Sequence, residues 1–286
     1  MPKRFTYYSS KASQWAGVGH LAIAEKGFTQ DDFKTIYIDL ITGENFDLGY
    51  LMINPNGTIP SLTSPFLNEP LTESVDILRF LDQLSDSGVT LVPTNPIVEE
   101  KVEAILEIVH SRQVDSNIIL LQARDTEELQ SKQATAGAFL RNRQVKLEKE
   151  AAASPSNAFY GPKIKQNMDI YKFFALPISS DHEAFFQKTH NDYQSFAQGV
   201  NQLESILVLP YAAGETVTEA DFNVIPWLSH CMAAAGTPEH EILNLDVLEK
   251  VVQKSVPNFV IGERTMQWWA NVSELKAFKE AFPFLH

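Results

Sequence analysis

The first residues that could do chemistry lie in the run from Asn54 to Leu62, with the letters NPNGTIPSL. Residues 54–57 form a strong turn signal, and Ile59-Pro60 then opens a predicted strand. Proline supplies no ladder donor, so this position is unusual. A cis Ile59-Pro60 bond is one reason for it, because it would turn the Ile59 N–H and C=O toward an extended peptide. An ordinary turn followed by an edge strand is the alternative.

The second signal is Thr72-Glu73-Ser74, at the predicted start of a helix over residues 72–84. The N–H groups and the dipole of a helix N-terminus favour anions. Glu73 could bind an ammonium group while the hydroxyl and N–H of Ser74 bind a carboxylate. Together they would hold the head group of a free amino acid. The alternative is that Thr72 or Ser74 is an ordinary N-cap.

The two motifs at this spacing resemble the glutathione-binding half of the glutathione transferase family, and the resemblance covers residues 5–84. In that family the residue before the cis-proline pairs with the cysteinyl backbone of glutathione. A Glu-Ser pair binds its γ-glutamyl end. The resemblance therefore implies that Ile59, Glu73 and Ser74 bind glutathione as a co-substrate.

Members of this family activate the glutathione thiol with a Ser, Tyr or Cys near the start of the first helix. Ser13 falls where serine-type members keep their catalytic serine. A hydroxyl donor at a helix N-terminus stabilises the thiolate and lowers the thiol pKa from about 8.5. Ser13 is the expected catalytic residue, with Tyr8, Ser9 and Ser10 as alternatives. Ser13 as a plain N-cap is the structural interpretation.

The same segment departs from the family pattern. Gly17-Val18-Gly19-His20 stands where an Arg or Lys often follows the catalytic serine, and Thr58 stands where Lys or Gln is common. His20 is expected to be structural. No cysteine lies near this helix, which disfavours thiol–disulfide exchange.

The elements that must position these residues read as β-α-β, a turn region, and then β-β-α. We predict strands at 5–8, 36–40, 59–63 and 67–71, and helices at 13–26 and 72–84, with Gly27 ending the first helix. A right-handed crossover would join the two parallel strands. Residues 1–84 are therefore predicted to form a four-stranded, thioredoxin-like α/β domain that binds glutathione.

Residues 85–97 are rich in Ser, Asp, Thr and Pro and are predicted to be a linker. Residues 98–286 are predicted to form an all-helical domain that shapes the acceptor pocket. Thr218 and Asp221 have the spacing of a capping box and resemble the N-capping box of the family's helical domain. Loss of Asp221 is expected to cost ~1 kcal/mol or more.

The region from about 135 to 192 makes the helical part longer than usual for the family, an enlargement that several fungal glutathione transferases share. Its aromatic residues would either line an extended acceptor pocket or, as the commoner use, pack an added helix pair. These residues are Phe159, Tyr160, Tyr171, Phe173, Phe174, Phe185 and Phe186.

Composition excludes several function classes. The formal net charge of −13 disfavours nucleic acid and anionic membranes as partners. The single cysteine, Cys231, permits no intramolecular disulfide and no thiolate metal cage, and it is expected in the core. We find no run of about 18 apolar residues and no signal-peptide pattern after the basic start. A cytoplasmic protein is expected.

The resemblance implies a glutathione transferase in which the activated thiol attacks an electrophilic, hydrophobic acceptor, as in detoxification. It implies no metal or redox cofactor, and a homodimer. A glutathione-dependent isomerase or etherase of natural-product metabolism is the second hypothesis. The third is a non-catalytic ligand-binding or regulatory protein on the same fold.

Overall fold

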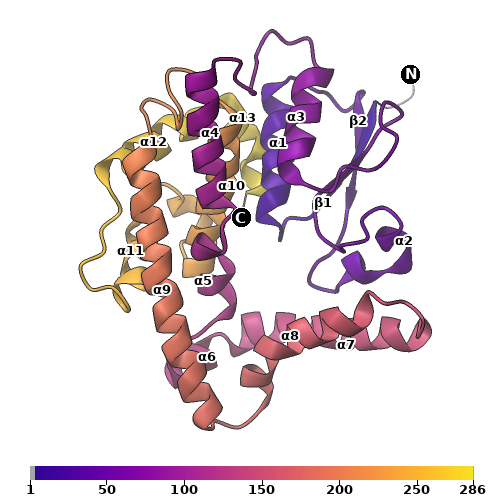
Figure 1. Ribbon diagram of the computed structural model, residues 1–286, viewed down its shortest axis with the longest axis vertical. Coiled ribbons are helices and arrows are strands. Elements are labelled where there is room, and N and C mark those ends of the chain that lie inside the picture. Colours follow the sequence, from indigo (N-terminus) through magenta and orange to yellow (C-terminus); the bar gives the residue numbers. More distant parts are fainter. Residues whose placement is uncertain (1–3, 286) are drawn as a thin grey trace.

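The computed structural model describes residues 4–285 (Figure 1). Residues 1–3 and 286, which the expected domain bounds and the N-terminal signal interpretation include, lie outside this range. The chain opens with β1 (Phe5–Ser9), α1 (Gln14–Glu25) and β2 (Phe33–Tyr37). β1 pairs in parallel with β2 and sets Phe5 opposite Phe33, whose rings stack at 5.2 Å. The predicted strand at 36–40 was therefore placed three residues too late, because this register brings Phe33 into the sheet.

The sheet continues on the other side of β1 with β3 (Ser61–Thr63), in the order β2-β1-β3. β3 is antiparallel to β1. The predicted strand at 67–71 is reduced to one bridge between Leu62 and Leu71, so three strands and a bridge replace the four expected. Between β2 and β3 lie a 3-10 turn, η1 (Glu44–Phe46), and the short α2 (Leu48–Leu51), neither of which was predicted.

The helix α3 (Ser74–Leu84) follows the hairpin and packs beside α1. This arrangement of sheet and helices is the thioredoxin-like fold predicted from the sequence, followed by a helical remainder. Within the described residues the remainder contains no strand, only isolated bridges near residues 208–214. Its helices are α4 (Pro96–Val109), α5 (Asn117–Leu121), α6 (Thr126–Ser131), α7 (Ala138–Ala153), α8 (Tyr160–Ala175), α9 (Ser180–Ile206), α10 (Glu219–Ala235), α11 (Asp246–Gln253), α12 (Glu263–Ser273) and α13 (Lys276–Ala281).

The central helix of this remainder is α10, which packs against α1, α3 and α4 and so joins the two parts of the chain. It begins with the capping box predicted at Thr218 and Asp221. Its Cys231 is fully buried, as expected. Burial also raises the pKa of this thiol well above its usual value, so it stays protonated.

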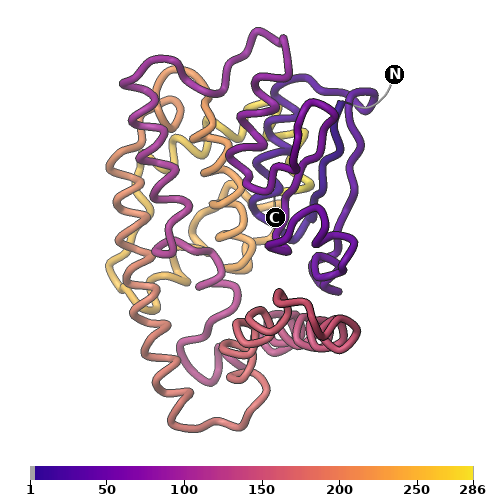
Figure 2. The backbone as a smooth tube through the Cα atoms, turned by 45° about the vertical axis from the view of Figure 1, so that its right-hand side comes forward, coloured from indigo at the N-terminus to yellow at the C-terminus, as the bar shows by residue number. Residues whose placement is uncertain are grey.

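The helices α7 and α8 lie side by side and cross below α2 (Figures 1 and 2). They contact the N-terminal part directly: the Tyr160 hydroxyl donates to the Phe46 carbonyl at 2.9 Å, and Lys146 pairs with Asp47. Only a short loop joins them, since α7 continues to Ala153 and α8 begins at Tyr160. This helix pair forms a wall that faces the start of α1.

The seven aromatic residues of the enlarged region pack the added helices, which confirms the commoner interpretation. Phe159 and Tyr160 join a cluster around Phe46 and Leu147. The other five belong to a second cluster at the ends of α7, α8 and α9.

Gly17 and Gly19, which depart from the family pattern, are explained by the close packing of α1. A Cβ on Gly17 would lie 2.7 Å from the Pro226 side chain in α10. A Cβ on Gly19 would lie 2.3 Å from the Tyr7 hydroxyl, which is buried under α1 and donates to the Ala16 carbonyl at 2.7 Å. Small residues therefore let α1 approach both β1 and α10.

We expect Gly19→Ala to lower the free energy of unfolding by about 2 kcal/mol. Overpacking of a core costs about 1–3 kcal/mol, and the better helix propensity of alanine returns at most about 1 kcal/mol. Gly49→Ala in α2 is the control, because no atom lies within 4 Å of its Cβ position. Urea unfolding of both variants checks this. An unchanged midpoint for Gly19→Ala would show that Tyr7 can move.

Candidate active site

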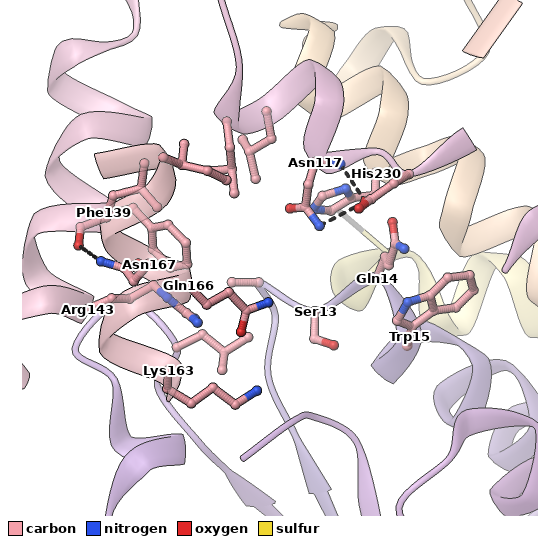
Figure 3. Close-up of a pocket in the computed structure, with 17 residues that line it drawn as sticks. Ser13, Gln14, Trp15, Asn117, Phe139, Arg143, Lys163, Gln166, Asn167 and His230 are labelled. Carbon is pink, nitrogen blue, oxygen red and sulfur yellow. Dashed lines mark hydrogen bonds between the residues drawn. The ribbon is translucent and has the colours of Figure 1, made fainter. Parts of the chain in front are cut away.

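A cavity of about 370 Å³ lies between the start of α1 and the helical part of the chain (Figure 3). One wall is formed by Ser13, Gln14 and Trp15 with Leu40. The opposite wall comes from α5, α7, α8 and α10. Its lining is mixed: apolar residues alternate with amides and charges. The residues of this second wall are Asp115, Asn117, Leu120, Leu121, Phe139, Leu140, Arg143, Lys163, Gln166, Asn167, Ile170 and His230.

Ser13 occupies the N-cap position of α1, but its hydroxyl makes no capping hydrogen bond. It donates instead to the Ile59 carbonyl at 2.9 Å. The N-cap interpretation is therefore correct for the backbone and wrong for the side chain. A hydroxyl that is not used for capping can turn toward a group in the cavity while the α1 dipole favours negative charge there.

The three alternatives to Ser13 do not line this cavity. Ser9 is fully buried and lies 2.8 Å from His20 Nε2. Ser10 lies on a separate shallow groove, and the Tyr8 ring packs near Tyr50. His20 is structural as expected: it stacks on Phe284, and burial lowers its pKa to about 4, so it is neutral at pH 7.

The Ile59-Pro60 bond is cis, as predicted. The turn before it is fixed by side chains, because Asn45 Nδ2 donates to the Gly57 carbonyl at 2.7 Å and the Tyr50 hydroxyl donates to the Thr58 carbonyl at 2.7 Å. Within residues 4–285 the Ile59 N–H donates no hydrogen bond, and its carbonyl accepts only from Ser13. This backbone can therefore pair with an added extended chain.

Glu73 and Ser74 stand at the N-terminus of α3. Glu73 is the N-cap residue and is exposed, whereas Ser74 is the first helical residue and is buried. The alternative of Thr72 or Ser74 as N-cap is therefore wrong. The isolated antiparallel bridge between Leu62 and Leu71 lies three residues along the chain from both Ile59 and Ser74. Neither Ile59, Glu73 nor Ser74 lines the cavity that contains Ser13.

Two cavity residues, Arg143 of α7 and Lys163 of α8, were not predicted as site residues. Their side chains extend into the cavity toward the side where Ser13 lies (Figure 3). Burial lowers the pKa of Arg143 to about 10 and, with the neighbouring Arg143 charge, lowers that of Lys163. Arg143 sits four residues from both Phe139 and Leu147. A cation on the apolar face of a helix was the available sequence signal.

A polar chain connects α10 to the start of α1. His230 Nδ1 lies 2.9 Å from the Ser116 hydroxyl, which in turn donates to Gln14 Oε1 at 2.5 Å. The Ser116 hydroxyl donates its hydrogen to Gln14, so the His230 Nδ1–H must donate to the Ser116 oxygen. Burial lowers the pKa of His230 to about 4, and the ring is neutral at pH 7. These hydrogen bonds hold Gln14, the residue next to Ser13, against the helical wall of the cavity.

No helix in the described part of the chain is long and apolar enough to span a membrane. Among the same residues, no group of His, Cys, Asp and Glu is arranged to hold a metal ion.

Comparisons with known proteins agree with this architecture. Residues 8–88 match the model of the glutathione S-transferase N-terminal domain. The β-etherase LigF from Sphingobium sp. strain SYK-6 has a TM-score of 0.64 at 16% identity, with 98% of each chain covered.

A maleylacetoacetate isomerase from Methylobacterium extorquens AM1, solved with malonate and glutathione, gives a TM-score of 0.57 at 18% identity, with 98% of this chain and 97% of that chain covered. A glutathione transferase homologue from Sulfitobacter, with bound glutathione, gives 0.55 at 15% identity, covering 98% and 96%. No curated protein matches the sequence. The resemblance to glutathione transferases is confirmed, and the whole chain has their fold.

Proposed function

We propose that this chain, whose N-terminal domain is that of a glutathione S-transferase, is a glutathione-dependent enzyme that activates the glutathione thiol. In this proposal residues 1–84 bind glutathione, residues 85–97 link the domains, and residues 98–286 shape the acceptor pocket. The observation that carries it is the contact between Ser13 and Ile59. It places a hydroxyl at a helix N-terminus beside a backbone that can pair with a peptide.

The proposed binding mode follows from the unused hydrogen-bonding groups. The Ile59 N–H and C=O pair with the cysteinyl residue, as in an added strand. The exposed Glu73 carboxylate binds the γ-glutamyl ammonium, and the hydroxyl and N–H of Ser74 bind its carboxylate. The bridge between Leu62 and Leu71, three residues along the chain from both Ile59 and Ser74, supports this assignment.

In the proposed reaction, Ser13 donates its hydrogen bond to the sulfur in place of the Ile59 carbonyl. This bond and the α1 dipole favour the thiolate, and the thiol proton passes to solvent. The thiolate forms a bond to an electrophilic carbon of the acceptor in the cavity, and the leaving group departs with the bonding electrons. No metal or redox step is required.

The same thiolate serves two other reactions. Reversible addition to a conjugated double bond would permit isomerisation, and displacement at an ether carbon would cleave the ether. Both reactions are part of the proposal, because the chain is similar in fold to an isomerase and to a β-etherase. A cytoplasmic homodimer acting in detoxification is expected from the family resemblance.

We expect the thiol of protein-bound glutathione to titrate about one to two pKa units below its free value of about 8.5, because the thiolate accepts a charge-assisted hydrogen bond. The thiolate absorbs in the ultraviolet, so its absorbance against pH gives the pKa directly. Bound glutathione with an unshifted thiol would support the non-catalytic alternative. Absence of binding would refute the proposal.

A further inference from the structure

The cations Arg143 and Lys163 differ from the other basic residues of α7 and α8 in their surroundings. The Arg143 guanidinium lies 4.8 Å from the centre of the Phe46 ring and 5.2 Å from that of Phe139. Lys163 Nζ lies 5.6 Å from the centre of the Phe159 ring. Neither side chain forms a salt bridge or hydrogen bond with any residue of the described chain. Lys146, one turn from Arg143, pairs with both Asp47 and Glu150.

Two half-buried like charges without a counter-ion are unfavourable, because burial removes water and each cation raises the energy of the other. The chain has 36 acidic residues, yet among the described residues that line this cavity the one carboxylate is that of Asp115. Asp115 accepts from the backbone and the side chain of Asn117 on the α5 side. An anionic group entering the cavity would compensate the pair and accept their hydrogen bonds.

We propose that Arg143 and Lys163 bind a carboxylate of the molecule held opposite Ser13. The inference rests on the proposed function for the identity of that molecule. The aromatic rings lie against the charged ends of both cations, and Gln166 belongs to the same cavity lining. Leu120, Leu121, Phe139 and Ile170 supply an apolar part of the same lining. The site therefore selects a ligand with an apolar body and a terminal carboxylate.

The carboxylate belongs either to glutathione or to the acceptor, and the two cations would bind it in the same way. The first is the glycyl carboxylate of glutathione, since α7 and α8 contact the segment between β2 and β3 at Phe46 and Asp47. The second is a carboxylate on the acceptor, since the same cations face Ser13 across the cavity. Binding measurements with matched ligands distinguish these sources.

The test compares the double variant Arg143→Gln/Lys163→Gln with Arg141→Gln/Lys165→Gln. The control pair removes two charges from the same two helices at exposed positions outside the cavity. Calorimetry measures Kd for glutathione, γ-glutamylcysteine, S-hexylglutathione and S-(5-carboxypentyl)glutathione. We expect the cavity variant, but not the control, to weaken binding of one carboxylate-bearing ligand at least about tenfold relative to its partner lacking that carboxylate.

A selective loss for glutathione over γ-glutamylcysteine assigns the glycyl carboxylate. A selective loss for the carboxypentyl over the hexyl conjugate assigns the acceptor. Folded variants with neither selective loss would overturn the proposal. The wild-type chain and the Arg143→Gln/Lys163→Gln variant are also compared by NMR saturation transfer with adipate and hexanediol. If it bound adipate through Arg143 and Lys163 but no glutathione, the carboxylate site would stand and the proposed function would fail.

Discussion

Replacement of Ser13 by alanine is expected to raise the pKa of bound glutathione by about 1–2 units and to lower kcat at pH 7 by about 8–25-fold. A hydrogen bond to a charged group is worth about 1.5–3 kcal/mol, and 1.36 kcal/mol corresponds to one pKa unit. Ser13 is the one candidate hydroxyl of the four that lines the cavity. As the thiol pKa rises above the working pH, the thiolate fraction falls in proportion.

The Kd of glutathione should change little, because the proposed contacts at Ile59, Glu73 and Ser74 remain in Ser13→Ala. Ser10→Ala and Tyr8→Phe are the matched controls and should keep the wild-type thiol pKa. Thiolate absorbance against pH, with a generic electrophile for kcat, measures both quantities. If Tyr8→Phe rather than Ser13→Ala abolished the shift, the catalytic assignment would move to Tyr8.

Replacement of Asp221 by alanine is expected to lower the free energy of unfolding by about 3–5 kcal/mol, more than the ~1 kcal/mol of a lost cap. The carboxylate is fully buried and accepts from the N–H and hydroxyl of Thr218 at 2.9 and 3.2 Å. It also accepts from the Ala212 N–H at 2.7 Å and from Trp268 Nε1 at 2.8 Å. Alanine would leave these buried donors unpaired.

Two further variants separate these contributions. Thr218→Ala removes one hydroxyl of the capping box and should cost about 1 kcal/mol. Asp246→Ala, at the exposed first turn of α11, should cost less than about 1 kcal/mol. Urea unfolding measures all three. A loss for Asp221→Ala no larger than that for Thr218→Ala would mean that Ala212 and Trp268 find other acceptors.

Local signals in the sequence predicted the N-terminal architecture well. The turn at 54–57, the cis Ile59-Pro60 bond and the start of the helix near Glu73 each depend on a few adjacent residues. The same is true of the capping box at Thr218. The strand at 36–40 was misplaced because the bounds of a strand depend on the strand it pairs with. Here β1 pairs with residues 33–37.

The sequence by itself therefore determined the β-α-β start of the chain, the resemblance to glutathione transferases and the position of Ser13 at a helix start. Only the tertiary structure decided that the Ser13 hydroxyl contacts Ile59, 46 residues away, and that α7 and α8 cross back to the segment around Phe46. It also decided that Arg143 and Lys163 enter the cavity. A helix pattern shows which face is apolar but not which distant surface covers it, because that choice depends on packing across the whole chain.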